Sequence, residues 1–225
     1  MTSQTTPTAQ PRHLASLAIA RQAILDESQA VFGYELFDRS VESNSHTAAS
    51  DAQLLFNVLS LNENESLIGK KTIFLNCTHE SLAGSHLDLV APERIVLEIQ
   101  PLHISQIGDI PNRLPRLEEI KRRGFRLAFD YSVLTRAYVH WLPLASFIKF
   151  DLSILKPEVV ASFVKLAQGN SKAILIAEKV ETLAQYEMMK SLGVKLFQGY
   201  WFAQPSVVKG QALRPAQITI LQLIN

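Results

Sequence analysis

The stretch SFIKFDLSILKPEVVASFVKLAQGNSKAILIAE (146–178) contains two short apolar runs with a helical pattern between them. The runs SFIKFD (146–151) and AILIAE (173–178) each have the length and apolar content of a buried strand. Pro157 stands where a helix can begin, because the first turn does not need its missing N–H, so a helix is predicted over 157–168. A strand, a crossover helix and a second strand form the unit from which parallel sheets are built.

The same alternation of apolar runs and helical patterns extends over most of the chain. Further helices are predicted over 47–61, 114–123 and 183–192. Strands are predicted at 14–20, 30–36, 72–76, 94–99, 125–130, 146–151, 173–178 and 194–199. This pattern predicts an α/β fold, a TIM-like (β/α)8 barrel.

The first two predicted strands are joined only by ILDESQ (24–29). A link of this length is too short for a crossover helix, so the two strands must form an antiparallel hairpin. The barrel is therefore predicted to contain one antiparallel strand.

The composition is that of one large domain with a proper core, since the chain has 225 residues and is 47% hydrophobic. A net charge of +1 does not favour nucleic-acid binding. The single cysteine, Cys77, excludes an internal disulfide, and no apolar run reaches the roughly 18 residues that a membrane span needs. We therefore predict a cytoplasmic location and no membrane span.

Three regions are predicted along the chain. Residues 1–13 are polar and lack the apolar segment of a signal peptide, which predicts a disordered leader before a barrel over 14–210. The amphipathic end PAQITILQLIN (215–225) leaves two interpretations of 211–225. It is either a terminal helix that packs on the barrel or the start of a linker to a missing domain.

Polar side chains lie at or near the ends of seven predicted strands. Because parallel strands of a barrel end at one face, these side chains should converge at one mouth. Carboxylate and amide oxygens there could bind Mg²⁺ or Mn²⁺. The alternative is that polar residues end strands simply because loops begin there. The residues are Glu35, Asn76, Glu98, Asp130, Lys149, Glu178 and Gln198.

The sequence segments around these residues resemble the EAL domain of cyclic-di-GMP phosphodiesterases, from about residue 20 to 205. The matching segments are VFGYELFDR (31–39), IFLN (73–76), IVLEI (95–99), LAFD (127–130), IKFD (148–151), IAEKVET (176–182) and LFQGYWFAQP (196–205). The segments RQ-x-I-x-D, GYEL and AEKVET also resemble EAL domains that precede an HDOD domain. This resemblance implies that the full-length protein carries a C-terminal HDOD domain.

The resemblance also implies a role for each site residue. Metal ligands would be Glu35, Asn76, Glu98 and Asp130. Catalytic positions would be Lys149, Glu178 and Gln198. Ligand contacts, with cyclic-di-GMP as the ligand, would come from Gln22, Arg39 and Asp151, and Arg39 stands where an Arg holds a phosphate.

Two departures from the family pattern affect the chemistry. Hydrolysing members carry two adjacent Asp followed by Phe-Gly, whereas this chain has Asp130-Tyr131-Ser132-Val133. Pro101 also stands where the family has a Glu that steadies the neighbouring loop. A phenol supplies no carboxylate at neutral pH, so the second metal site is predicted to be lost while one Mg²⁺ or Mn²⁺ could still bind.

Three functions follow from this pattern. The first is a regulatory domain without catalytic activity that acts through contacts with an unidentified protein partner. The second is a receptor that binds cyclic-di-GMP without cutting it. The third is a slow, metal-dependent phosphodiesterase. The missing carboxylate favours the first, in which the catalytic positions are vestigial.

Overall fold

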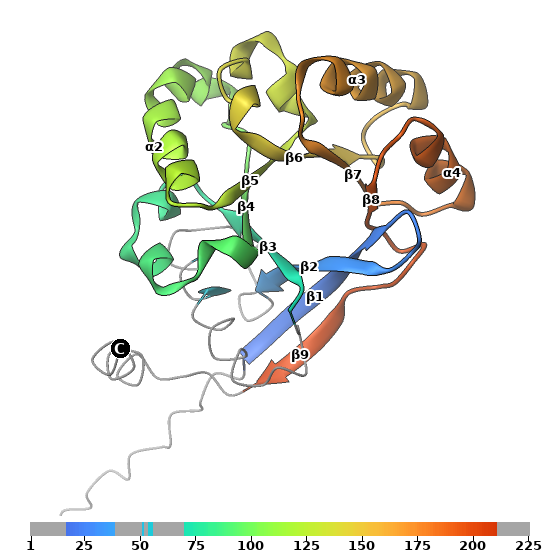
Figure 1. The fold of residues 1–225 in the computed structure, drawn as a ribbon, viewed down its shortest axis with the longest axis horizontal. Coiled ribbons are helices and arrows are strands. Elements are labelled where there is room, and N and C mark those ends of the chain that lie inside the picture. The colour runs from blue at the N-terminus through green and yellow to red at the C-terminus, as the bar shows by residue number, and fades with distance from the viewer. Residues whose placement is uncertain (1–16, 39–50, 52–53, 56–69, 211–225) are drawn as a thin grey trace, which may run out of the picture.

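The computed structural model describes residues 17–38, 51, 54–55 and 70–210. Nine strands of this part of the chain form one sheet, with helices outside it (Figure 1). The strands are β1 (Leu17–Asp26), β2 (Val31–Asp38), β3 (Thr72–Cys77), β4 (Ile95–Ile99), β5 (Arg126–Asp130), β6 (Ala145–Asp151), β7 (Ile174–Glu178), β8 (Leu196–Phe197) and β9 (Ser206–Gly210).

The sheet closes into a barrel of eight strands. Strands β2 to β8 pair in sequence order and run parallel. Strand β1 closes the ring by pairing antiparallel with both β2 and β8. The predicted TIM-like barrel with one antiparallel strand is therefore confirmed. Strand β9, which was not predicted, pairs antiparallel with the start of β1.

The hairpin between β1 and β2 differs from its prediction in position. The predicted first strand ended at Ala20, whereas β1 continues to Asp26 and leaves a link of only 27–30. The Asp26 carboxylate accepts hydrogen bonds from the backbone N–H groups of Ser28 and Ala30, at 2.8 and 3.0 Å. This side chain ends the strand by closing a tight turn, in which Gln29 has a φ of 63°.

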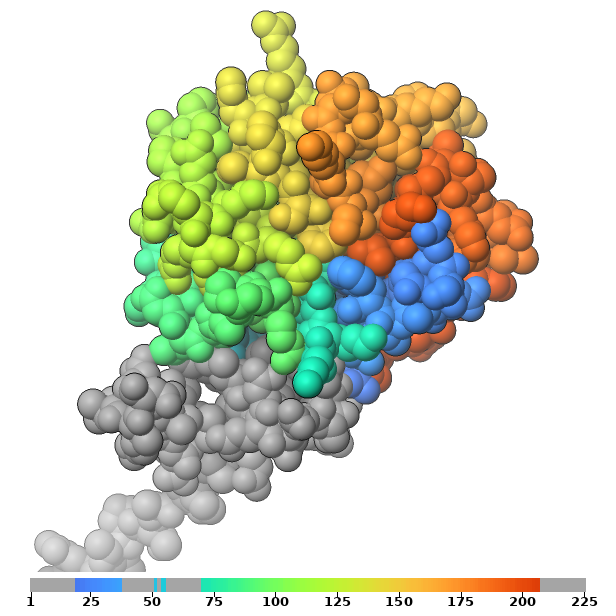
Figure 2. Space-filling model, viewed as in Figure 1, coloured from blue at the N-terminus to red at the C-terminus, as the bar shows by residue number. Residues whose placement is uncertain are grey.

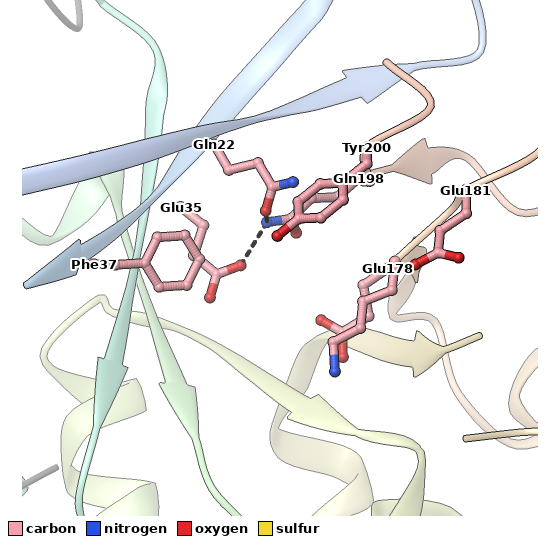
Figure 3. A pocket seen from close by; sticks show the side chains of 9 residues that line it. Gln22, Glu35, Phe37, Glu178, Glu181, Gln198 and Tyr200 are labelled. Carbon is pink, nitrogen blue, oxygen red and sulfur yellow. Dashed lines mark hydrogen bonds between the residues drawn. The ribbon is translucent and has the colours of Figure 1, made fainter. Parts of the chain in front are cut away.

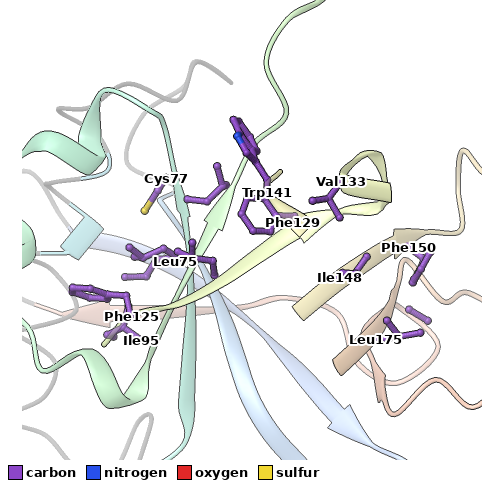
Figure 4. Packing of buried hydrophobic residues seen from close by; sticks show 14 of the residues in the cluster. Leu75, Cys77, Ile95, Phe125, Phe129, Val133, Trp141, Ile148, Phe150 and Leu175 are labelled. Atoms are coloured by element: carbon purple, nitrogen blue, oxygen red, sulfur yellow. The ribbon is translucent and has the colours of Figure 1, made fainter. Parts of the chain in front are cut away.

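Two layers of apolar side chains lie on the two faces of the barrel wall. The inner layer contains Phe74, Val96, Ala128, Phe147 and Ile176, together with Ile24 and Leu196. The outer layer packs between the strands and the helices (Figure 4). Because successive side chains of a strand point to opposite faces, neighbours of the inner residues belong to the outer layer.

Three α-helices whose full length lies within the described residues cover the outside of the barrel (Figure 1). They are α2 (Ile110–Arg122), α3 (Pro157–Asn170) and α4 (Leu183–Ser191). The predicted starts of α3 and α4 are confirmed, and α4 begins with a capping box between Thr182 and Gln185. Helix α2 begins four residues earlier than predicted, with a proline in its first turn.

Between residues 70 and 210, the other helical segments are short 3₁₀ helices. They span Ser81–Ala83, Ser85–Leu89, Pro92–Arg94, Ile104–Asp109, Tyr131–Leu134, Arg136–Tyr138 and Leu142–Leu144. Of the predicted helix over 47–61, the structure describes Asp51, Leu54 and Leu55, which are helical and buried. The rest of that helix, the predicted leader 1–13 and the predicted end 211–225 lie outside the described residues.

The first and last described segments lie side by side, as Figure 2 shows for one face of the molecule. This contact places the β1 side of the barrel next to the segment that follows β8. Within the described part of the chain, no helix combines the length and the apolar character that a membrane span requires.

Candidate functional site

The polar residues of the site form one ring directly above the inner apolar layer. Most of them lie two positions beyond an inner-layer residue, so they point into the barrel as well. Phe74 is followed in this way by Asn76, and Phe147 by Lys149. Strand β1 runs in the opposite direction, so Gln22 lies two positions before Ile24 and pairs in register with Glu35.

Lys149 occupies the centre of this ring. Its ammonium lies 3.1 Å from Glu35 Oε2, 2.8 Å from both carboxylate oxygens of Glu98, and 2.8 Å from Glu178 Oε2. The Lys149 side chain is only 2% exposed. A buried ammonium needs carboxylate partners, and three strands supply them here.

The Glu35 carboxylate is held by side chains on both sides. Asn76 Nδ2 donates to Glu35 Oε1 at 2.9 Å, and Gln198 Nε2 donates to Glu35 Oε2 at 2.8 Å. Gln198 Nε2 also lies 3.1 Å from Gln22 Oε1, and Figure 3 shows both contacts. Gln100 Nε2 donates to Asn76 Oδ1 at 2.7 Å. These bonds fix the orientation of each amide.

One ammonium does not neutralise three carboxylates, and the pKa values reflect this excess of negative charge. Burial and the neighbouring charges of Glu35 and Glu178 raise the pKa of Glu98 to about 8. Burial acts against ionisation of Glu35 too, but Lys149 and the amide hydrogen bonds hold its pKa below the ordinary value. The carboxylates raise the pKa of Lys149 although burial opposes this. Glu98 therefore binds a proton more readily than an exposed carboxylate does.

Asp130 and Asp151 are oriented by their own loops. Asp130 accepts a hydrogen bond from the backbone N–H of Ser132 at 3.0 Å. Asp151 Oδ1 accepts from the backbone N–H of Ser153 at 2.8 Å, and its Oδ2 lies 2.6 Å from the ammonium of Lys179. Burial raises the pKa of Asp130, although the hydrogen bonds from Ser132 act against this.

Tyr131 directly follows Asp130 and supplies an aromatic ring at the edge of the site. The ring is half-buried and packs against Phe163 of α3, with 5.3 Å between the ring centroids. The Tyr138 hydroxyl accepts a hydrogen bond from the backbone N–H of Leu102 at 3.0 Å. This bond joins the β5–β6 segment to the segment after β4, beside Pro101.

Two cavities open at the mouth, and Glu178 lines both. The larger, about 280 Å³, is lined by Gln22, Glu35, Phe37, Glu178, Lys179, Glu181, Gln198, Gly199 and Tyr200 (Figure 3). The smaller, about 160 Å³, is lined by residues that include Glu98, Gln100, Asp130, Tyr131 and Asp151. A Cβ at Gly199 would collide with the Val180 backbone, so glycine permits the close approach that forms the larger cavity wall.

Comparison with known proteins matches the sequence to the EAL domain family over residues 25–205. The chain belongs to the EAL domain family. It is 33% identical over 216 residues to the cyclic di-GMP phosphodiesterase CdgJ of Vibrio cholerae, a match that covers 92% of this chain and 48% of CdgJ. The uncharacterized protein YuxH of Bacillus subtilis is 31% identical, over 92% of this chain and 52% of YuxH. The chain thus spans about half the length of these curated relatives.

Solved EAL structures share the fold. Klebsiella pneumoniae BlrP1, in a complex with calcium and cyclic-di-GMP, superposes with a TM-score of 0.69 at 20% identity. The match covers 92% of this EAL domain and 60% of the BlrP1 chain. BlrP1 has also been solved with manganese and cyclic-di-GMP. The likeness supports the barrel architecture.

The oxygen atoms at the mouth of this EAL domain are of the chemical type that a hard cation prefers as ligands. Glu35, Glu98 and Asp130 offer carboxylate oxygens, and Asn76 offers an amide oxygen. Within the part of the chain that the structure describes, however, no three His, Cys, Asp or Glu side chains are grouped as metal ligands. The Lys149 ammonium lies between Glu35 and Glu98. A cation could bind these oxygens only by displacing it.

Nine of the ten predicted site residues meet at the mouth, and their roles stay predictions. The tenth, Arg39, lies outside the described residues. Sequence reasoning missed Gln100, although strand alternation from Glu98 could have found it. It also missed Lys179, whose position depends on backbone geometry. Cys77 is buried among apolar residues of the outer layer, because strand alternation turns it away from Asn76.

Proposed function

We propose that this EAL domain acts in cyclic-di-GMP signalling without hydrolysing the dinucleotide, as a regulatory module that works through protein contacts. The observation that carries the proposal is Tyr131, which follows Asp130 at the end of β5 and packs against Phe163. Hydrolysing members of the family have a second Asp at this position. Two-metal hydrolysis needs both cations to activate water and to stabilise the leaving oxygen, so losing a carboxylate there damages the chemical step.

The metal-binding capacity that we propose is one Mg²⁺ or Mn²⁺. Its ligands would be Glu35, Asn76, Glu98 and Asp130, which supply hard oxygen donors. Lys149 already compensates the charge of two of these residues. The ion therefore competes with an ammonium, which weakens its binding and makes it depend on pH.

A second candidate function is a receptor for cyclic-di-GMP, which the larger cavity favours. This cavity of about 280 Å³ retains Gln22 and Gln198, and the Gln198 Oε1 atom is buried with no hydrogen-bond partner among the described residues. An unpaired buried acceptor is costly, and a ligand N–H or O–H could satisfy it. The rings of Phe37 and Tyr200 border the same cavity (Figure 3).

We propose that a further domain, outside this chain, transmits the signal from the EAL domain. The chain spans about half the length of the relatives it matches. We propose that the full-length protein carries an HDOD domain after residue 225 and works in the cytoplasm, where it contacts a protein partner.

The test separates hydrolysis from binding. Cyclic-di-GMP is incubated with excess protein and saturating Mn²⁺, and the linear dinucleotide is followed by chromatography, with CdgJ as the active control. We expect no product from this chain. Binding is measured by calorimetry in Ca²⁺, and a measurable affinity without turnover assigns the receptor function. Turnover comparable to CdgJ overturns the proposal and restores the phosphodiesterase alternative.

A further inference from the structure

Lys179 has a backbone conformation that its residue type does not favour. Its φ of 56° lies in the left-handed region, where a Cβ makes the conformation costly. The adjoining backbone imposes this geometry, since Val180 N–H donates to the carbonyl oxygen of Gln198 at 3.0 Å and Trp201 N–H donates to that of Val180 at 3.0 Å. A strained non-glycine residue at the edge of a site points to a function of its side chain.

The charges around the larger cavity show what that side chain supplies. Glu35, Glu178 and Glu181 line the cavity, and among its described lining residues Lys179 is the one with a positive charge. Lys149 lies behind Glu35 and Glu178 and is almost fully buried. A phosphate that enters this cavity therefore meets carboxylates unless an accessible ammonium faces it.

The Lys179 ammonium is both accessible and exchangeable. Its side chain is 57% exposed and pairs with Asp151 at 2.6 Å. An ion pair this exposed contributes little to stability, because water and salt screen it. Exchanging Asp151 for a phosphate oxygen replaces one charge-assisted hydrogen bond by another of similar strength.

We propose that Lys179 binds a phosphodiester group of the nucleotide ligand in the larger cavity, in exchange for its contact with Asp151. The inference rests on the receptor function proposed above. It assigns the anionic part of the ligand to the β7–α4 side of the mouth, where Lys179 and Glu178 follow one another. The positive charge of Lys179 thereby allows the larger cavity to bind an anion although glutamates line it.

The test compares two lysines that are similar in exposure and in ion pairing but lie at different positions in the barrel. Lys195 is 59% exposed and pairs with Glu27 at 2.9 Å, but it precedes β8 at the opposite end of the barrel. Binding of cyclic-di-GMP in Ca²⁺ is measured by calorimetry at two salt concentrations for the full chain and for Lys179→Gln, Lys179→Arg and Lys195→Gln. Circular dichroism melts verify that each variant is folded.

We expect Lys179→Gln to weaken the affinity about tenfold, the scale of one charge-assisted hydrogen bond, and to reduce its salt dependence. Lys179→Arg should retain most of the affinity, and Lys195→Gln should bind like the unchanged chain. If the unchanged chain binds and Lys179→Gln binds equally well, the role of Lys179 is wrong while the receptor function stands. An equal loss in Lys195→Gln also overturns it. If the unchanged chain binds no ligand, the receptor function fails and the inference fails with it.

Discussion

Replacement of Lys149 by Met tests how the mouth balances its charge. Lys149 is the cation that contacts Glu35, Glu98 and Glu178, and its side chain is 2% exposed. Methionine retains the length and the apolar stem but leaves the carboxylates without their ammonium. Removing one partner from a buried ion pair costs about 3–5 kcal/mol, because the remaining charge stays away from water. For a domain of this size the melting temperature should fall by about 6–20 °C.

Thermal melts in a metal chelator at pH 7.5 provide the measurement, followed by melts at lower pH and in Mn²⁺. At pH 5 the carboxylates of the variant can take up protons, so most of the lost stability should return. Mn²⁺ should raise the melting temperature of Lys149→Met more than that of the unchanged chain, because the ion no longer competes with an ammonium. Lys121→Met is the control, since Lys121 donates to the Leu144 carbonyl oxygen at 2.6 Å.

Two results would refute the reasoning. A loss below about 2 °C at pH 7.5 would mean that the buried ammonium does not hold the carboxylates. A larger loss that neither acid nor Mn²⁺ reduces, and that Lys121→Met reproduces, would assign Lys149 a packing role alone.

Three further predictions concern single residues. In a metal chelator, the free energy of unfolding should fall as pH rises from 4.5 to about 8, because Glu98 binds its proton more tightly in the folded chain. Urea titrations measure this profile, and Glu98→Gln should flatten it. Lys179→Gly should be about 1 kcal/mol more stable than Lys179→Ala, because the φ of 56° strains a residue with a Cβ; equal stabilities would contradict this. Tyr138→Phe should cost about 1 kcal/mol, since Leu102 N–H loses its acceptor, and an unchanged melting temperature would show that the bond contributes nothing.

The barrel was predictable because strand alternation and crossover length are local properties of the sequence. The run SFIKFD already places Phe147 and Lys149 on one face of a strand, one in the apolar layer and one at the mouth. The end of β1 was misplaced because Asp26 closes its turn with a side chain, which an apolar pattern does not reveal. Strand β9 was missed because its five residues form a strand only by pairing with β1.

The members of the site were predictable, but their contacts were not. Strand ends converge in any parallel barrel, so the polar residues could be assigned to one mouth. That Lys149 contacts three carboxylates depends on distances across the barrel, which the sequence does not contain. The bond between Tyr138 and Leu102 joins segments 36 positions apart, and the strain at Lys179 comes from its neighbours in space.

The charge balance of the mouth bears on our proposal that this domain binds an anionic ligand without hydrolysing it. A second carboxylate at position 131 would add negative charge beside Asp130 and Glu178 and would require a further cation. Tyr131 removes that charge, and Lys149 compensates part of what remains. Buried carboxylates that are paired with an ammonium hold a fixed shape without a metal ion. In our proposal, the substitution that disables two-metal chemistry therefore also lowers the electrostatic repulsion that the mouth exerts on an anionic ligand.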